Sequence, residues 1–183
     1  MISRMTHTVK MNVAMKYGGI RGLWNTSEEQ LRDELTQAQA DGFLEYRDAG
    51  KVVAYAEELR RNDISYIYPG HKLYPGKLYD IPDPPMLLFA AGDVDVLADL
   101  DPAVAVVGAR KASVYGREAA DRLSGELAAS GVTIVSGMAL GIDGAAHRAA
   151  MKAGGKTVAV LGSGINVPVS YTHLRAHETS AHL

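Results

Sequence analysis

The chain lacks cysteine altogether, which excludes disulfides, thiolate metal sites and a cysteine nucleophile. It also lacks an uninterrupted apolar run of the ~20 residues that a membrane-spanning helix needs. The segment Met1–Lys16 has no long apolar core of the kind found in a signal peptide. These absences lead us to expect a cytoplasmic protein that does not associate with membranes.

Positive and negative charges are also nearly balanced in the sequence. The formal net charge is −2, with 22% charged and 47% hydrophobic residues, which is ordinary for a folded domain. Nucleic-acid-binding proteins often carry a basic face, but a local cluster can be hidden within a nearly neutral total. Composition therefore permits nucleic-acid binding without indicating it. The 183 residues provide for one domain, or for one domain with a small helical appendage.

Three short apolar runs, each ending at Gly or Ser-Gly, organise the C-terminal half: Val104–Val107, Val132–Val135 and Thr157–Leu161. Continuous apolarity rich in β-branched residues predicts strands buried on both faces, as in a parallel sheet. Helical patterns over Gly116–Ser130 and Asp143–Gly154 separate them, and the first has a single apolar stripe of Ala119, Ala120, Leu123 and Leu127. This order predicts an α/β fold with a Rossmann-like parallel sheet, whose carboxyl strand ends meet at one edge.

The glycine-rich strand ends predict a phosphate-binding site at that edge. Glycine allows a sharp turn that exposes backbone N–H groups, and each following helix adds the partial positive charge of its N-terminus. Arg110 is the main candidate cation, because a guanidinium binds phosphate through two parallel hydrogen bonds. The candidate phosphate-binding residues are Gly108, Arg110, Lys111, Ser113, Ser136, Gly137, Gly141, Gly162 and Gly164.

Several polar residues have structural alternatives. Lys111 is equally compatible with a side chain that simply points to solvent, and Ser113 with an N-cap of the following helix. Asp143 and His147 lie four residues apart, a spacing that suits a metal, but no third ligand accompanies them. We therefore expect Asp143 to be a helix N-cap and His147 a packing or hydrogen-bonding residue, with no metal or cofactor. No activated nucleophile is recognisable, so we expect no enzyme.

Residues 1–62 are predicted to form a leader and a small helical region. Thr26 and Glu29 fit a capping box at the start of one helix, and a second amphipathic helix is expected from about Asp48 to Arg61. Beyond this region, a group of tyrosines has two interpretations, base stacking or packing against prolines and the sheet edge. We favour packing, because Tyr is often partly buried. These tyrosines are Tyr66, Tyr68, Tyr74 and Tyr79.

The segments VGARKASVYG, SGMALGIDGAAH and AGGKTVAVLGSGINV resemble the DNA-processing protein A family, called DprA or Smf. The resemblance covers roughly Leu23 to Val167. It implies a Rossmann-like core after a small SAM-like or helix-hairpin-helix-like region. It also implies a non-catalytic protein that binds single-stranded DNA, protects incoming DNA and loads RecA recombinase in natural transformation, as a homodimer when full-length. Two positions depart from the family: Ala109 replaces a serine, and Leu140 stands where many members carry arginine.

We expect residues 63–168 to be a partial core and residues 169–183 to be a non-native tail. A family member continues after Pro168 with Tyr-Pro, whereas this chain reads VSYTHLRAHET. That string resembles the conceptual translation of a transposon-type sequencing adapter, so the family's core is expected to be truncated at its C-terminal side.

An enzyme is the alternative from another class. The lysine-decarboxylase-like (LOG) nucleotide phosphoribohydrolases share the Rossmann-like core and the glycine-rich phosphate loops. Their usual PGGxGTxxE motif is absent from the sequence, but it would lie beyond Val167, where the resemblance ends, so this absence does not decide between the two. The SGMALGIDGAAH segment favours the DprA resemblance.

Overall fold

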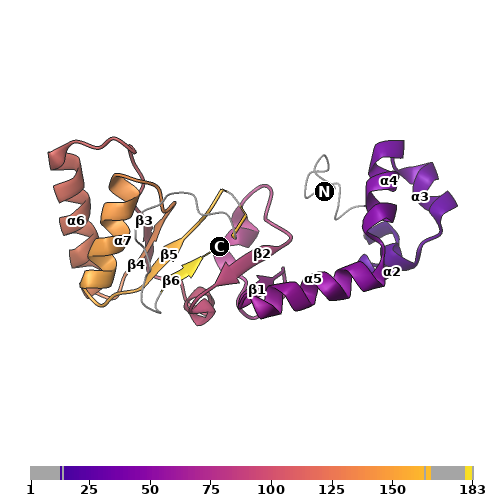
Figure 1. Ribbon diagram of the computed structural model, residues 1–183, viewed down its shortest axis with the longest axis horizontal. Helices are drawn as coiled ribbons and strands as arrows, with labels where there is room; N and C mark the ends of the chain where they lie inside the picture. The colour runs from indigo at the N-terminus through magenta and orange to yellow at the C-terminus, as the bar shows by residue number, and fades with distance from the viewer. Residues whose placement is uncertain (1–12, 14, 163, 166–179, 183) are drawn as a thin grey trace. The chain divides into compact units, whose positions relative to one another are not determined.

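The computed structural model describes residue 13 and residues 15–162, 164–165 and 180–182. The chain forms two compact units (Figure 1). The first, here the N-terminal unit, comprises Met1–Asn62 and Lys77–Met86, and the second, the sheet unit, comprises Asp63–Gly76 and Leu87–Leu183. Most of the predicted leader, residues 166–168 and all but three residues of the predicted tail lie outside the described residues.

Helices make up most of the N-terminal unit. α3 begins one residue later than predicted, because Ser27 and Gln30, rather than Thr26 and Glu29, form its capping box. The two overlapping Ser/Thr-x-x-Glu/Gln patterns compete, and the Thr26 hydroxyl instead donates to the carbonyl of Gly22. The helices are α2 (Ile20–Asn25), α3 (Glu28–Glu34), α4 (Gln37–Tyr46) and α5 (Ala49–Arg61), and a 3-10 helix η1 spans Gly76–Asp80.

The start of α5 agrees with its prediction, whereas α4 was not predicted. Asp48 caps α5, and its carboxylate accepts hydrogen bonds from the N–H groups of Gly50 and Lys51 at 2.8 and 3.2 Å. α4 contains Gly42 and mostly short or polar residues, so it carries little amphipathic signal.

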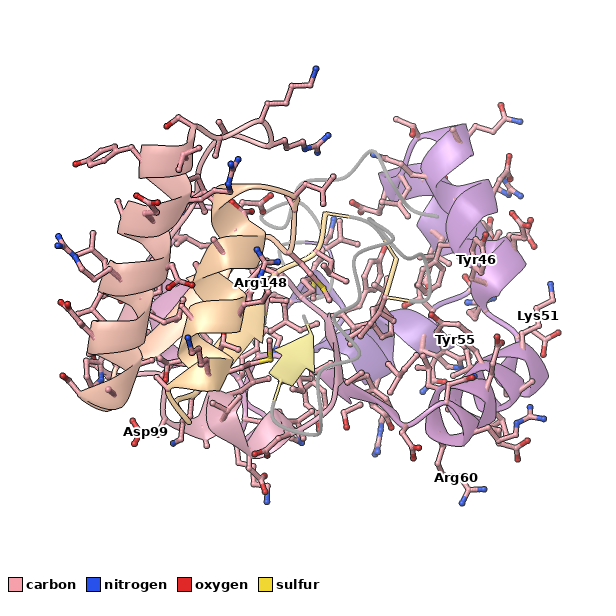
Figure 2. All side chains as sticks on the ribbon, turned by 60° about the vertical axis from the view of Figure 1, so that its left-hand side comes forward. Tyr46, Lys51, Tyr55, Arg60, Asp99 and Arg148 are labelled. Carbon is pink, nitrogen blue, oxygen red and sulfur yellow. The ribbon has the colours of Figure 1, made fainter. Side chains whose placement is uncertain are left out.

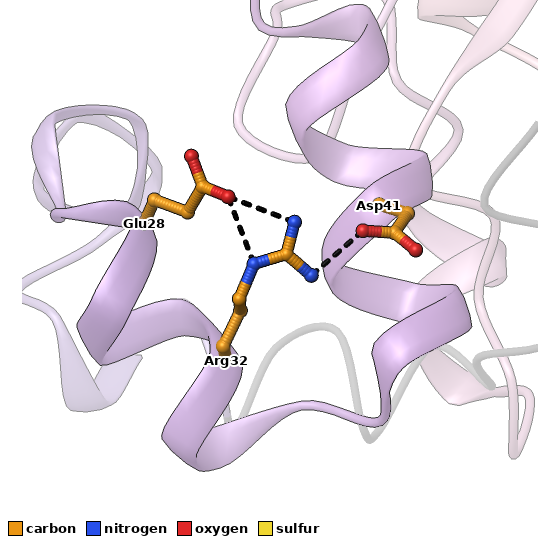
Figure 3. Close-up of polar contacts among 3 residues, drawn as sticks. All are labelled: Glu28, Arg32 and Asp41. Atoms are coloured by element: carbon orange, nitrogen blue, oxygen red, sulfur yellow. Dashed lines mark hydrogen bonds and ion pairs between the residues drawn. The ribbon is translucent and has the colours of Figure 1, made fainter.

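Arg32 joins α3 to α4 (Figure 3). Its Nε donates to Glu28 Oε1 at 2.8 Å, and its Nη1 donates to Asp41 Oδ1 at 2.7 Å. The hydrogen bond to Asp41, then that to Glu28, raises the pKa of Arg32 above its ordinary value. All three side chains are in contact with water, which screens the charges, so the contact orients the helices more than it stabilises them.

The sheet unit contains six strands in the order β1-β2-β6-β5-β4-β3. β3 to β6 run parallel, and β2 is antiparallel to both β1 and β6. The predicted α/β fold with a parallel sheet is therefore confirmed, and an antiparallel pair extends it. The strands are β1 (Ile64–Ile67), β2 (Leu88–Ala91), β3 (Ala103–Ala105), β4 (Thr133–Ser136), β5 (Thr157–Ala159) and β6 (Ser180–His182), with a 3-10 helix η2 (Val94–Ala98) between β2 and β3.

Two helices, α6 (Val114–Ala129) and α7 (Ile142–Lys152), connect the parallel strands and pack side by side against the sheet (Figure 1). Their apolar core is built from small residues around Ile134, which is fully buried. The cluster consists of Ala128, Ile134, Ala146 and Ala150, with Val106 and Leu127 packed against it. Alanines at the helix contact allow close approach, which places the β4 side chain between α6 and α7.

The buried face of α6 is rotated relative to its prediction. Sequence periodicity placed Ala119, Ala120, Leu123 and Leu127 on one inward stripe, whereas the structure buries Ala120, Ser124 and Ala128, and Leu123 is 51% exposed. The small side chains face α7 because the two helices lie too close for leucines between them.

The expectation of burial on both faces is correct for β5 and wrong for β3. All three residues of β5 are buried, whereas Val104 of β3 is 39% exposed. β3 is the edge strand of the sheet, so only β4 flanks it. Among the described residues, no helix is long and apolar enough to cross a membrane.

We expect Ile134→Ala to lower the free energy of unfolding by about 2–5 kcal/mol, because it removes a fully buried side chain and leaves a cavity between helices that cannot close further. Urea denaturation followed by circular dichroism measures the change. The control is Val104→Ala on the edge strand, expected to cost less than about 1 kcal/mol. Equal costs for the two variants would contradict this core.

Candidate functional site

The three glycine-rich loops meet at one edge of the sheet unit, as the parallel strands require. The first loop (residues 106–113) follows β3, the second (137–141) follows β4, and the third, described at residues 160–162 and 164–165, follows β5. The hydrogen bonds between strands continue one residue into the loops. The N–H of Val106 donates to the carbonyl of Val135 at 2.9 Å, and the N–H of Val160 donates to the carbonyl of Ser136 at 2.8 Å. Backbone hydrogen bonds therefore connect the three loops where they leave the sheet.

Asp143 ties the first two loops together. Its Oδ1 accepts from the N–H of Gly108, and its Oδ2 accepts from the N–H of Gly137, both at 3.2 Å. The residue is only 6% exposed. The prediction that Asp143 is the N-cap of α7 is wrong, because the cap is Gly141 and the carboxylate turns away from the helix toward the two loops. The anion at the base of the loops is thus the chain's own carboxylate.

Gly108 and Gly137 leave space for the side chains of Ile142 and Asp143 at the base of the loops. Their N–H groups already donate to the carboxylate of Asp143. A Cβ on Gly108 would lie 2.6 Å from Cγ1 of Ile142, and one on Gly137 would lie 2.9 Å from Oδ2 of Asp143. A side chain at Gly108 would therefore collide with Ile142, and one at Gly137 would displace the carboxylate of Asp143.

Gly141 allows the first loop to cross the beginning of α7. It has φ of +88°, and a Cβ there would lie 2.2 Å from the carbonyl oxygen of Ala109 and 2.6 Å from that of Arg110. The next residue, Ile142, donates its N–H to the same Ala109 carbonyl at 3.3 Å. This crossing fixes the backbone that carries Arg110.

The two serines predicted to bind phosphate instead form hydrogen bonds with the chain's own backbone. Ser136 is buried and its hydroxyl donates to the carbonyl of Val106 at 2.5 Å, which links β4 to the end of β3. The Ser113 hydroxyl accepts from the N–H of Gly116 at 3.0 Å, so Ser113 is the N-cap of α6, the structural alternative considered for it.

The solvent side of the edge carries the cations. Arg110 and Lys111 are both exposed in the first loop. In the described part of the chain, neither side chain has an ion-pair partner. In the third loop, Gly162 and Gly164 are exposed, and among the described residues other than its chain neighbours no heavy atom lies within 4 Å of the position of a Cβ on Gly162. In that part of the chain, the exposed groups on the outer side of the loops thus include two glycines and the side chains of Arg110 and Lys111.

Arg148 is a further cation that sequence reasoning missed. It is an exposed residue of α7 (Figure 2), and its Nη1 lies 3.1 Å from the position that a Cβ on Gly144 would take. The guanidinium therefore folds back along the first turn of α7, where Gly144 donates its N–H to Ala139 of the second loop at 3.0 Å. The signal was the glycine four residues earlier, which leaves room for the arginine on the same helix face.

His147 has a hydrogen-bonding role inside the fold, as predicted. Its Nδ1 lies 2.7 Å from Thr157 Oγ1, and that hydroxyl donates its single proton to the carbonyl of Ile134 at 2.8 Å. The imidazole must therefore donate from Nδ1 to Thr157. Since Asp143 turns to the loops and His147 to β5, the two side chains do not form a pair of metal ligands.

The fold and the site define a Rossmann-like α/β protein whose glycine-rich strand ends present exposed cations. The family model described as DNA recombination-mediator protein A matches residues 65–181. The chain belongs to this family, which includes the proteins called DprA and Smf, and this confirms the resemblance seen in the sequence. The match favours the DprA interpretation over the LOG alternative.

Relatives named DprA support the assignment over most of the chain. The chain is 34% identical over 156 residues to DNA processing protein DprA of Bacillus subtilis (strain 168), covering 83% of the chain and 51% of that protein. It is 47% identical over 94 residues to DprA of Streptococcus pneumoniae, covering 51% of the chain and 32% of that protein. The chain thus spans about half, or less, of the length of these relatives.

Two solved structures resemble this one. The X-ray structure of DprA from Streptococcus pneumoniae superposes with a TM-score of 0.72 at 26% identity, covering 99% of this chain and 63% of that one. A structure that gives insights into the unique single-stranded DNA binding mode of DNA processing protein A from Helicobacter pylori superposes with a TM-score of 0.55 at 26% identity, covering 65% of this chain and 54% of that one.

We expect Gly141→Ala to destabilise the chain more than Gly131→Ala. Both glycines have positive φ, +88° and +86°, but only Gly141 has backbone atoms within 3 Å of the Cβ position. A backbone held at positive φ costs about 1–3 kcal/mol for alanine, and overpacking against the Ala109 carbonyl adds about 1–3 kcal/mol. Urea denaturation of the two variants measures both costs, and equal costs would contradict the close crossing of the first loop over α7.

Proposed function

We propose that this chain binds single-stranded DNA through its phosphates, at the carboxyl edge of the parallel strands. The observation that carries the proposal is the set of three exposed cations, Arg110, Lys111 and Arg148. The first two lie on the loop that Asp143 and Gly141 hold in place, and the guanidinium of Arg148 folds back along the first turn of α7. The similarity to the Helicobacter pylori protein, whose structure concerns single-stranded DNA binding, supports the same ligand.

The carboxylate of Asp143 decides where a phosphate binds. Because it already accepts the N–H groups of Gly108 and Gly137, a phosphate at the base of the loops would find those donors engaged and would face a negative charge. Phosphates therefore bind on the outer rim, where Arg110 offers a bidentate contact and Lys111 and Arg148 add charge. Exposed Gly162 and Gly164 let the strand pass close to the third loop.

Contacts of this kind give affinity without base specificity, and the affinity falls as salt rises. They require no catalytic group, so we propose a binding protein rather than an enzyme. From family membership we further propose the fuller role: protecting incoming DNA and loading RecA recombinase in natural transformation, in the cytoplasm and as a homodimer when full-length.

The test is a fluorescence-anisotropy titration of labelled oligo-dT at several salt concentrations. Arg110→Ala is expected to weaken binding roughly tenfold, the equivalent of about 1.4 kcal/mol, because a charge-assisted hydrogen bond is lost. The slope of log K against log salt should fall by about 0.7, the value for one phosphate contact on a single strand. Arg148→Ala should change both quantities in the same direction.

The matched control is Arg122→Ala, an exposed arginine in the middle of α6, which should leave the affinity and the slope unchanged. If wild type and Arg110→Ala bind oligo-dT equally, with no salt dependence, the assignment of the DNA site to this edge is wrong.

A further inference from the structure

Two tyrosines of the sheet unit lie outside the site described above. Tyr66 and Tyr68 are 51% and 49% exposed, whereas Ile67 between them is fully buried. Alternation along β1 places Tyr66 on the face opposite Ile67, and Tyr68 directly follows the last residue of the strand. Tyr66 also lies opposite Phe89 of β2 in the ladder. Of the four tyrosines for which packing was expected, only Tyr74, at 6% exposed, is buried, whereas Tyr79 is 52% exposed and this pair is similarly exposed.

The ring of Tyr68 is held in position without being covered. His71 donates its N–H to the Tyr68 carbonyl at 2.9 Å, with Pro69 and Gly70 between them and a φ of +93° at Gly70. This is a type II turn with the residues that the turn requires. The His71 ring accepts from the N–H of Leu73 at 3.2 Å and meets the Tyr68 ring edge to face, with centroids 5.6 Å apart.

The strand order places this aromatic pair on the same edge as the cations. β1 is antiparallel to β2, β2 is antiparallel to β6, and β6 runs parallel to β5, β4 and β3. The carboxyl end of β1, which leads into Tyr68, therefore points the same way as the strand ends that lead into the glycine-rich loops. β1 and β3 are the two outer strands of the six.

The span of this edge suits a short single strand. Five inter-strand steps of ~4.8 Å separate β1 from β3, which makes roughly 24 Å. At the ~3.4 Å per nucleotide of a stacked strand, about seven nucleotides cover that distance. A strand whose phosphates lie on Arg110 at one end therefore reaches Tyr68 at the other.

We propose that Tyr68, with Tyr66 beside it, is a stacking site for a base of single-stranded DNA bound along this edge. The inference rests on the proposed DNA binding and adds to it the place where bases, rather than phosphates, are contacted. An exposed tyrosine ring held by its turn stacks on any base, because every base has a π-face, so the site adds affinity without sequence preference.

The experiment compares two labelled probes of about ten nucleotides, within the usual site sizes for single strands: oligo-dT and an abasic oligonucleotide with the same phosphates. Tyr68→Ala is expected to weaken oligo-dT binding roughly tenfold, the loss of one stacked base, and to leave binding of the abasic probe unchanged. Tyr68→Trp should keep the affinity, and its added fluorescence should be quenched by oligo-dT but not by the abasic probe.

The control, Tyr46→Ala, removes a tyrosine of equal exposure (50%) from the N-terminal unit (Figure 2) and should change neither affinity.

The outcomes separate this inference from the function on which it rests. If Arg110→Ala weakens oligo-dT binding and Tyr68→Ala does not, the stacking site is overturned and the phosphate site stands. Equal weakening of both probes by Tyr68→Ala also overturns stacking, since the abasic probe has no base to stack. If wild type binds neither probe, both proposals fail.

Discussion

The site depends on the two hydrogen bonds that the carboxylate of Asp143 accepts from the loops after β3 and β4. This carboxylate is buried at the start of α7 and accepts one N–H from each of the two loops. Hydrogen bonds to an ionised acceptor are stronger than neutral ones, and removal of such an acceptor would leave two loop donors unsatisfied. One side chain therefore holds two strand ends and a helix start in a single arrangement.

This arrangement changes the meaning of the glycines. In a phosphate-binding loop, glycines usually expose N–H groups to the ligand. Here Gly108, Gly137 and Gly141 instead make room for Ile142, Asp143 and the backbone of the first loop. The positive groups left for a ligand are side chains on the outside of the loops. Such a surface suits a long, flexible polyanion better than a small anion enclosed on all sides.

Local patterns predicted β3, β4, β5, α6 and α7 to within about two residues, because strands of a parallel sheet are continuous apolar runs that end at glycine. They did not predict β6, which lies in the segment expected to be a non-native tail. What failed depends on tertiary contacts. Nothing local distinguishes an Asp143 that caps its own helix from one that turns to two other loops. Arg148 was missed because its position in the sequence does not show that its guanidinium folds back over Gly144 toward the start of α7. The exposure of Tyr68 required the strand order, which follows from pairings far apart in the sequence.

The most direct test of this account is amide hydrogen exchange of the free chain and its oligo-dT complex, measured by NMR at Gly108 and Gly137. Because Asp143 already accepts both N–H groups, we expect both amides to exchange slowly without DNA and DNA to add no protection, whereas Asp143→Asn should speed exchange at one or both. Rapid exchange in the free chain, with protection that appears only when DNA binds, would contradict the account. It would mean that these N–H groups are donors for phosphate, and the glycine-rich loops would then be an anion cradle after all.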